Sequence, residues 1–203
     1  LNYAGTVASK VILTGSATGA NVLTFANVNK SGVVVDFSTN TVSGSYGNAT
    51  IASANIKSVI GSGYSESITL TNTSVAFDGM GGGDTVIFGT NTTSAVTYSA
   101  GAKSYNLNGL TANLHNISVL DLSKNTNTGN AGYNYTLSAA DIVGMMTGPG
   151  SSITIKTYTN DKHTVTGAGL TYTEVSNGTG FTGTITGAGG STYTVQWQTV
   201  TTH

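Results

Sequence analysis

The chain lacks cysteine and arginine altogether, and its single proline is Pro149. Without cysteine it can form neither disulfide bridges nor a thiolate metal site. Only 7% of its 203 residues are charged and the formal net charge is −1, so no basic patch is available to displace counterions from nucleic-acid phosphates. No apolar run approaches the roughly 20 residues of a transmembrane helix. These shortages argue against nucleic-acid binding and against membrane insertion.

In place of charge, the chain is rich in threonine, serine, asparagine and glycine. Hydrophobic residues make up 38% of it, which favours a folded protein over a disordered one. Short β-branched runs such as KVILTG, GVVVDF, ESITLT and DTVIFG recur, each bounded by Gly, Asn, Ser or Thr. This pattern is typical of many short strands joined by tight turns. We therefore predict an all-β protein.

A single short helix is expected near residues 139–147. In YTLSAADIVGMMTGPG, Ser138 is a good N-cap residue, and Asp141 lies three positions later, where it completes a capping box. Leu137 and Ile142 are spaced to form a hydrophobic staple across the helix start. The Gly-Pro-Gly at 148–150 stops the helix after about two turns.

A nine-residue repeat is visible around GMGGGDTVI at 79–87. It fits the nonapeptide pattern G-G-x-G-x-D-x-U-x, in which U is a large apolar residue, at Gly79, Gly82, Asp84 and Val86. The apolar position recurs nine and eighteen residues earlier at Phe77 and Ile68, whereas the glycines and the aspartate are only partly kept. Two nonapeptides, about 18 residues, complete one coil of a parallel β-roll. The repeat predicts Ile51, Ile68, Phe77 and Val86 in the interior.

The same coil geometry predicts a calcium site. Glu66 and Asp84 are eighteen residues apart, so their carboxylates should stack on adjacent coils and repel each other unless a cation lies between them. Calcium takes about 6–8 oxygen ligands, which must then come from two coils. The candidate ligands are Glu66, Asp78, Gly82 and Asp84. The alternative is a glycine turn with solvated aspartates, and a phosphate loop is disfavoured because a strand follows where a helix is needed.

The segment 32–89 resembles the repeat region of RTX-type proteins, which Gram-negative bacteria export by type I secretion. The second half is similar to a recurring module of giant RTX adhesins in its motifs ISVLDLS (117–123), YTLSAADIV (135–143), KHTVTGAG (162–169) and YTVQW (193–197). The resemblance implies a secreted, extracellular or cell-surface protein that serves adhesion, biofilm cohesion or a surface layer, with calcium aiding its folding. This chain departs from the family at several calcium aspartates, as at Ala49, Glu66 and Val75.

No catalytic site is expected. Glu66 and Asp84 form the only predicted pair of acids, and hydrolysis of a polysaccharide needs two such groups converging on the substrate. The segment 161–163, Asp-Lys-His, is interpreted as a solvated hairpin turn, and neither a nucleophile elbow nor a HExxH motif occurs. Aromatic residues offer a separate possibility, since tyrosine packs well against sugars or proteins. At least half of the following set should instead face the core: Tyr133, Tyr135, Tyr172, Tyr193 and Trp197.

We therefore expect a degenerate parallel β-solenoid over residues 1–100, and over 101–203 a β-rich module, sandwich-like or continuing the solenoid, that carries the helix. The leading functional hypothesis is a structural or adhesive module of a secreted bacterial surface protein. Its partners would be other copies of itself or cell-surface polymers and glycans. A self-assembling subunit of an extracellular fibre or surface lattice is one alternative, because solenoid ends are open sheet edges. A carbohydrate-binding module is another.

Overall fold

The computed structural model of the chain describes residues 11–13, 19, 21–29, 32–44, 47–52, 55–71, 74–88, 96–99, 102–109, 113–124, 132–148, 150–167 and 169–201. Short strands make up most of the described chain, and α1 (Ala139–Met145) is the α-helix among them. The prediction of an all-β protein with one short helix is therefore confirmed.

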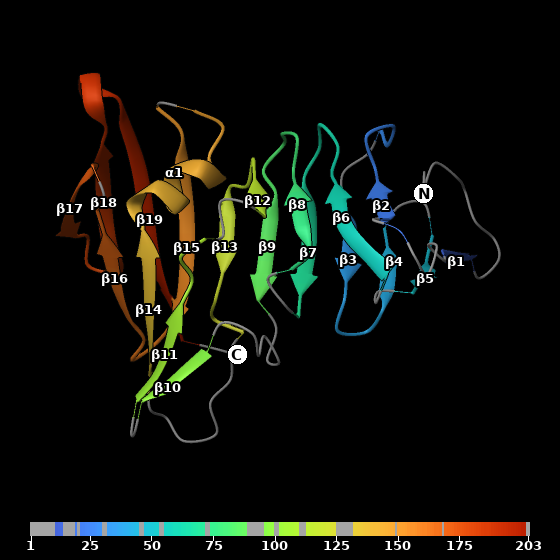
Figure 1. Cartoon of the computed structure of the whole chain (residues 1–203), viewed down its shortest axis with the longest axis horizontal. Helices are drawn as coiled ribbons and strands as arrows, with labels where there is room; N and C mark the ends of the chain where they lie inside the picture. The colour runs from blue at the N-terminus through green and yellow to red at the C-terminus, as the bar shows by residue number, and fades with distance from the viewer. Residues whose placement is uncertain are drawn as a thin grey trace.

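The largest sheet runs through the whole length of the molecule (Figure 1). Its eleven strands lie in the order β1 (Val11–Leu13), β5 (Ala49–Ile51), β4 (Thr41–Ser43), β3 (Val33–Asp36), β7 (Glu66–Leu70), β9 (Thr85–Phe88), β13 (Val119–Asp121), β15 (Ser152–Tyr158), β19 (Thr192–Val200), β18 (Gly180–Thr186) and β17 (Thr171–Ser176).

Two smaller sheets of four strands each accompany it. One has the order β12 (Leu114–His115), β8 (Ala76–Asp78), β6 (Ile56–Ile60) and β2 (Asn21–Thr24). The other has the order β10 (Val96–Ser99), β11 (Ala102–Asn106), β14 (Tyr133–Ser138) and β16 (Lys162–Thr166). A short 3-10 turn, Ala188–Gly190, lies between β18 and β19.

The pairing of strands is mixed, which corrects a purely parallel expectation. Parallel pairs join β3, β7, β9, β13, β15 and β19 in sequence, and they also join β2, β6, β8 and β12. Antiparallel hairpins lie toward both ends of the large sheet, where β4 pairs with β3 and β5, and β18 pairs with β17 and β19. The terminal strand β1 pairs with β5 in parallel. The pair β9–β13 spans the expected boundary near residue 100.

The predicted eighteen-residue step is present where it was expected. Ile68 of β7 lies opposite Val86 of β9 in parallel register, and Val59 of β6 lies opposite Phe77 of β8. All four side chains are buried. Ile51, the remaining predicted core residue, is buried as well. The apolar repeat thus correctly located the interior of this segment.

Two rows of aligned apolar side chains form much of the core, one on the large sheet and one on the β2–β12 sheet. Buried side chains of the third sheet and of α1, such as Tyr135 and Ile142, complete it. Because side chains alternate between the faces of a strand, residues in register point to the same side. The row on the large sheet is almost fully buried and consists of Val35, Ile68, Val86, Leu120, Ile155 and Trp197. The row on the β2–β12 sheet is Leu23, Val59, Phe77 and Leu114.

Helix α1 begins as its sequence predicts. The Ser138 side chain accepts a hydrogen bond from the backbone N–H of Asp141 at 3.0 Å, and the Ser138 hydroxyl bonds back to the Asp141 carboxylate. Ile142 and Met145 are fully buried, so the helix covers part of the core. Turns after strands also form as expected, since Asp36 Oδ1 accepts from the backbone N–H of Ser38 at 2.7 Å.

Replacing one residue of the inward row tests this core. We expect Ile68→Ala to lower the free energy of unfolding by about 2–5 kcal/mol, because the cavity lies between two strands and cannot collapse. The neighbouring Ser67→Ala, whose side chain points outward, should change it by no more than about 0.5 kcal/mol. Urea unfolding at constant pH measures both. Equal effects of the two variants would contradict the assigned register.

Candidate functional site

Two loops between the sheets bring Glu66 and Asp84 together. Residues 61–65 connect β6 to β7, and residues 79–84 connect β8 to β9. Glu66 is the first residue of β7, and Asp84 directly precedes β9. The backbone N–H of Glu66 donates to Oδ1 of Asp84 at 2.8 Å. The predicted stacking of these two acids on adjacent strands is therefore present.

Both acids are buried, and their oxygen atoms are unequally satisfied. Glu66 is 5% exposed and accepts from the backbone N–H of Ser62 at 2.8 Å and from the Ser62 hydroxyl. Asp84 is fully buried, and its Oδ2 has no hydrogen-bond partner. Burying a carboxylate oxygen without a partner is costly. The corner is thus a place where either a proton or another ligand would be favoured.

Two glycines allow the chain to approach these carboxylates closely. A Cβ atom at Gly79 would lie 2.3 Å from Oδ2 of Asp84, and a Cβ atom at Gly61 would lie 2.8 Å from Oε2 of Glu66. Neither distance is compatible with a side chain. The glycines that resemble a metal-binding loop in the sequence therefore make room for buried carboxyl groups.

Burial and the neighbouring acid change the protonation of the pair. Loss of hydration, joined by the negative charge of Glu66, raises the pKa of Asp84 to about 7 against the lowering effect of the Glu66 N–H. Near neutral pH the Asp84 carboxyl group therefore holds a proton for a large part of the time. A neutral Asp84 avoids the repulsion that two ionised carboxyl groups would experience.

The other two predicted metal ligands, Asp78 and Gly82, make separate contacts. Oδ1 of Asp78 accepts from Nδ2 of Asn116 at 2.7 Å and from the backbone N–H of Met80 at 3.0 Å. A Cβ atom at Gly82 would collide with the backbone of Tyr64, and the Gly82 carbonyl accepts from the Ser65 hydroxyl at 3.2 Å. The structure thus joins two of the four predicted ligands.

This donor set does not fit calcium as it stands. Three of the four carboxylate oxygens of the pair already accept hydrogen bonds, whereas calcium takes about 6–8 oxygen ligands. Among the described residues, no three acids or histidines gather as a metal-binding group. Calcium binding stays a prediction.

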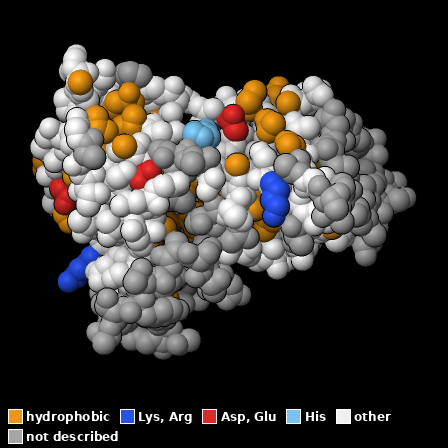
Figure 2. Space-filling view, viewed as in Figure 1, with side chains coloured by type: hydrophobic (Ala, Val, Ile, Leu, Met, Phe, Trp, Pro, Cys, Tyr) orange, Lys and Arg blue, Asp and Glu red, His pale blue; other side chains and the backbone are white. Residues whose placement is uncertain are grey.

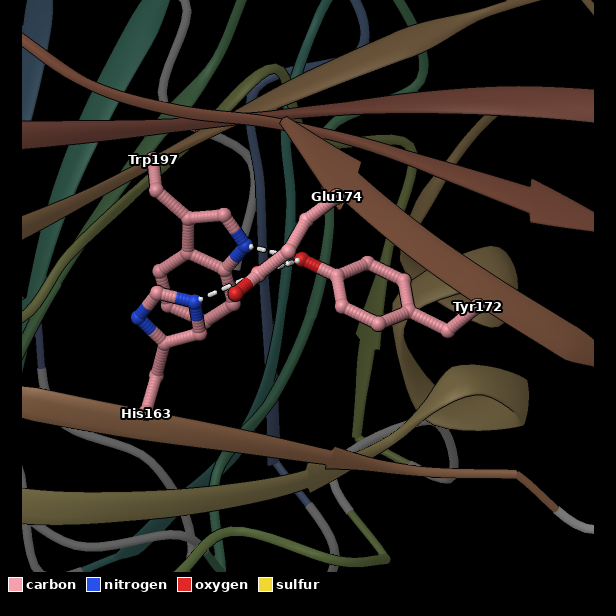
Figure 3. Close-up of polar contacts among 4 residues, drawn as sticks. All are labelled: His163, Tyr172, Glu174 and Trp197. Carbon is pink, nitrogen blue, oxygen red and sulfur yellow. Dashed lines mark hydrogen bonds and ion pairs between the residues drawn. The ribbon is translucent and has the colours of Figure 1, made fainter. Parts of the chain in front are cut away.

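A second polar cluster lies near the C-terminal end of the large sheet (Figure 3). His163 of β16 stacks on Trp197 of β19 with ring centroids 3.7 Å apart and an interplanar angle of 9°. Nε2 of His163 lies 3.0 Å from Oε2 of Glu174, which also accepts from the Tyr172 hydroxyl at 2.7 Å. The indole N–H of Trp197 donates to that hydroxyl at 2.8 Å.

The electrostatics of this cluster favour a fixed set of charges. Burial raises the pKa of Tyr172, and its hydrogen bond to Glu174 raises it further. Burial alone would raise the pKa of Glu174, but the hydrogen bonds from His163 and Tyr172 outweigh it and lower the pKa overall. At neutral pH Glu174 is therefore ionised and Tyr172 protonated. The side-chain contacts of this cluster join β16 to β17 and β19.

The sequence interpretation of residues 161–163 was half correct. Asp161 does close a turn, because its Oδ2 accepts from the backbone N–H of Tyr158 at 2.7 Å. His163, however, lies in strand β16 and contacts Trp197, thirty-four residues away. No local pattern indicates this contact. It becomes visible only when the register of the two sheets is known.

The aromatic side chains mostly face the core. Tyr133, Tyr135 and Trp197 are buried, and Tyr172 and Tyr193 are half-buried. Trp197 is 3% exposed and covered by His163, so a sugar ring cannot stack on it in this conformation. Trp197 is therefore among the aromatics that face the core, as at least half of this set were expected to do. Large exposed aromatics in the described chain are Tyr64 and Phe181.

Comparison with known proteins adds no family assignment: no protein-family model matches the chain, and no curated protein or solved structure is significantly similar to it. Within the described residues, no helix has the length and hydropathy needed to cross a membrane.

The Glu66–Asp84 pair predicts a dependence of stability on pH. The pKa of Asp84 is raised from 3.8 to about 7 in the folded chain, so the folded state binds a proton that the unfolded state releases. The free energy of unfolding should therefore fall as pH rises from about 4 to about 7, by at most roughly 1.4 kcal/mol per pH unit. Asp84→Asn keeps the acceptor for the Glu66 N–H and supplies a permanent donor, so it should flatten this slope and stabilise the protein at pH 8.

Urea unfolding at several pH values measures the slope. Asp36→Asn is the matched control, because hydrogen bonds from Ser38 and Thr39 outweigh burial and lower the pKa of Asp36. The stability that ionised Asp36 contributes is lost only as pH falls below the usual range of aspartate pKa values. The pH slope of Asp36→Asn above pH 5 should therefore equal that of the wild type. A slope in Asp84→Asn equal to that of the wild type would contradict protonation of Asp84 in the folded chain. Thermal melting at pH 8 with added calcium or with a chelator tests calcium binding. A higher melting midpoint with calcium would support a bound calcium ion, and an unchanged midpoint would contradict it.

Proposed function

We propose that this chain is a structural and adhesive module of a secreted bacterial cell-surface protein. Its parallel strands act as successive turns of a β-solenoid, with antiparallel hairpins added at both ends. The support for this proposal is the alignment of the inward rows, in which Ile68, Val86 and Leu120 follow one another in register across β7, β9 and β13. In such an arrangement each coil contacts only its neighbours, so the module can be long and stiff.

The surface of the molecule suits a scaffold. On the face drawn in Figure 2, charged side chains are few and lie apart from one another. One outward row of the large sheet runs in register through Ser67, Thr85, Val119 and Thr154, and three of these four side chains carry a hydroxyl group. A long, weakly charged face rich in hydroxyl groups can contact a partner over many points without strong attraction at any one of them.

A hydrolytic role fits the geometry less well. Glu66 and Asp84, the only predicted pair of acids, are buried at a corner where a polysaccharide chain cannot reach them. Glu174 and His163 bind each other and are further fixed by Tyr172 and Trp197. General acid–base catalysis needs a group within hydrogen-bond reach of the substrate. We therefore favour a structural and adhesive role over a hydrolytic one.

Display of the chain on cells tests the adhesive role. Bacteria that carry it on an outer-membrane anchor should be retained on each other, or on a surface coated with envelope polysaccharide, more strongly than bacteria that carry the anchor alone. A displayed chain in which Leu120→Asp breaks the inward row is the control for folding, because a charge in this position is buried without a partner. Retention equal to that of the anchor alone would contradict the proposal.

Self-assembly is the second candidate, and strand β17 supports it. β17 is a terminal strand of the large sheet. The backbone N–H of Asn177 donates to the Gly180 carbonyl at the hairpin turn, so alternation along the strand directs the backbone groups of Tyr172, Glu174 and Ser176 away from β18. Val175 is 72% exposed, and the strand has neither proline nor lysine to guard this edge.

The partner edge in this assembly would be β1 of a second copy. Two copies of β17 paired antiparallel would place their ionised Glu174 side chains opposite or diagonal to each other, which is unfavourable. Strand β1, Val-Ile-Leu, carries no charge and lies at the opposite end of the same sheet (Figure 1). Pairing of unlike edges repeats without closing and produces a fibre.

Removing one outward N–H tests this edge. Ser176→Pro should abolish self-association while leaving the hairpin intact, because the lost donor points away from β18. Ser176→Ala retains the N–H and is the control. Sedimentation velocity over a wide concentration range and electron micrographs measure assembly. A wild-type chain that stays monomeric at high concentration, or a Ser176→Pro variant that assembles normally, would contradict self-assembly without affecting the adhesive proposal.

A further inference from the structure

Strands β15, β17, β18 and β19 carry a regular group of threonines on one face of the large sheet. They occupy alternate positions, as in Thr-Tyr-Thr of β17, Thr-Gly-Thr-Ile-Thr of β18 and Thr-Tyr-Thr of β19. We call this group the threonine array; its members are Thr154, Thr171, Thr173, Thr182, Thr184, Thr186, Thr192 and Thr194.

The register aligns these residues in rows across the strands. Thr171 pairs with Thr186, which pairs with Thr192. The next row consists of Thr173, Thr184 and Thr194. Neighbouring threonines are therefore about 4.8 Å apart across the strands and about 6.7 Å apart along them, since alternate residues share a face. The array is a two-dimensional lattice of hydroxyl and methyl groups.

The array faces away from the core. Between its members lie Ile185 and Val195, which are completely buried on the other face of the sheet. The aromatic residues of β17, β18 and β19 alternate with array positions and also point to that other face; they are Tyr172, Phe181, Tyr193 and Trp197. Tyr158 of β15, which aligns with Val200, lies on the array face but outside the two complete threonine rows. The two complete threonine rows contain no charged side chain.

Individual hydroxyl groups on such a face bind weakly. A protein hydroxyl that leaves water for another hydrogen-bond partner gains only about 0.5–1.5 kcal/mol. Soluble sugars usually gain affinity from an aromatic ring, which the two complete threonine rows lack. Many weak contacts add up only when the partner is rigid and has a matching repeat, so that it loses no freedom on contact. The ligand that suits the array is therefore a solid.

We propose that the threonine array binds the surface of an ice crystal. Ice presents a rigid lattice of oxygen atoms that both donate and accept hydrogen bonds, as the threonine hydroxyl does. Threonine is β-branched, so its χ1 rotamers are restricted and its hydroxyl and methyl groups hold their positions before contact. Within the described residues, the hydroxyls of Thr173, Thr184 and Thr194 have no protein partner and are available to such a lattice. This inference does not depend on the scaffold role or on self-assembly.

Slow growth of ice from a solution of the fluorescently labelled protein tests the proposal. The wild-type chain should be incorporated in the ice and should inhibit its recrystallisation. Thr184→Lys places a long charged side chain in the middle row and should reduce the incorporated fraction by about tenfold or more, because several contacts are lost together. Thr184→Val keeps the shape but removes the hydroxyl, and should reduce incorporation less.

Thr164→Lys is the matched control, because Thr164 is an exposed residue of β16 in the other sheet. It introduces the same charge outside the array and should leave incorporation unchanged. Circular dichroism melting verifies that all variants are folded. Exclusion of the wild-type chain from ice, or equal effects of Thr184→Lys and Thr164→Lys, would overturn the proposal. Binding to crystalline cellulose or chitin together with exclusion from ice would overturn it as well, in favour of a polysaccharide lattice.

Discussion

The structure depends on the register between neighbouring parallel strands. A shift of one residue would turn Ile68, Val86 and Leu120 from the core to solvent, because side chains alternate along a strand. The lengths of the connections matter much less. Aligned residues are eighteen positions apart between Ile68 and Val86, but thirty-four between Val86 and Leu120 and thirty-five between Leu120 and Ile155. Long segments can therefore be inserted between strands as long as the apolar rows stay aligned.

The same register explains the buried acids. Once Ile68 is aligned with Val86, the residues two positions earlier must also lie side by side, and these are Glu66 and Asp84. The hydrophobic energy of the rows exceeds the cost of placing two carboxyl groups at one corner. Protonation of Asp84 lowers that cost, and Ser62 satisfies both oxygens of Glu66.

Features that depend on residues close together in the sequence could be predicted from it. Features that depend on the pairing of distant strands could not. Ser138 caps the helix and Asp36 caps its turn through residues two or three positions away. The nine-residue repeat located Ile68 and Val86 because it is itself a local pattern. The antiparallel hairpins at the sheet ends, the contact of His163 with Trp197 and the rows of threonines all depend on pairings between distant strands. For these, composition and spacing carry no signal.

The buried apolar row of the large sheet ends at Trp197, and this limits where further repeats can be added to the molecule. Beyond β19 the large sheet continues only as the antiparallel hairpin of β17 and β18, and His163 lies over the indole ring. A stack of repeats needs a terminal unit that covers its last apolar layer. An additional repeat placed beside β19 would have to displace β18, which pairs with β19 along most of its length. A chain that gains or loses whole repeats can therefore do so only upstream of β19, so its length varies from one side.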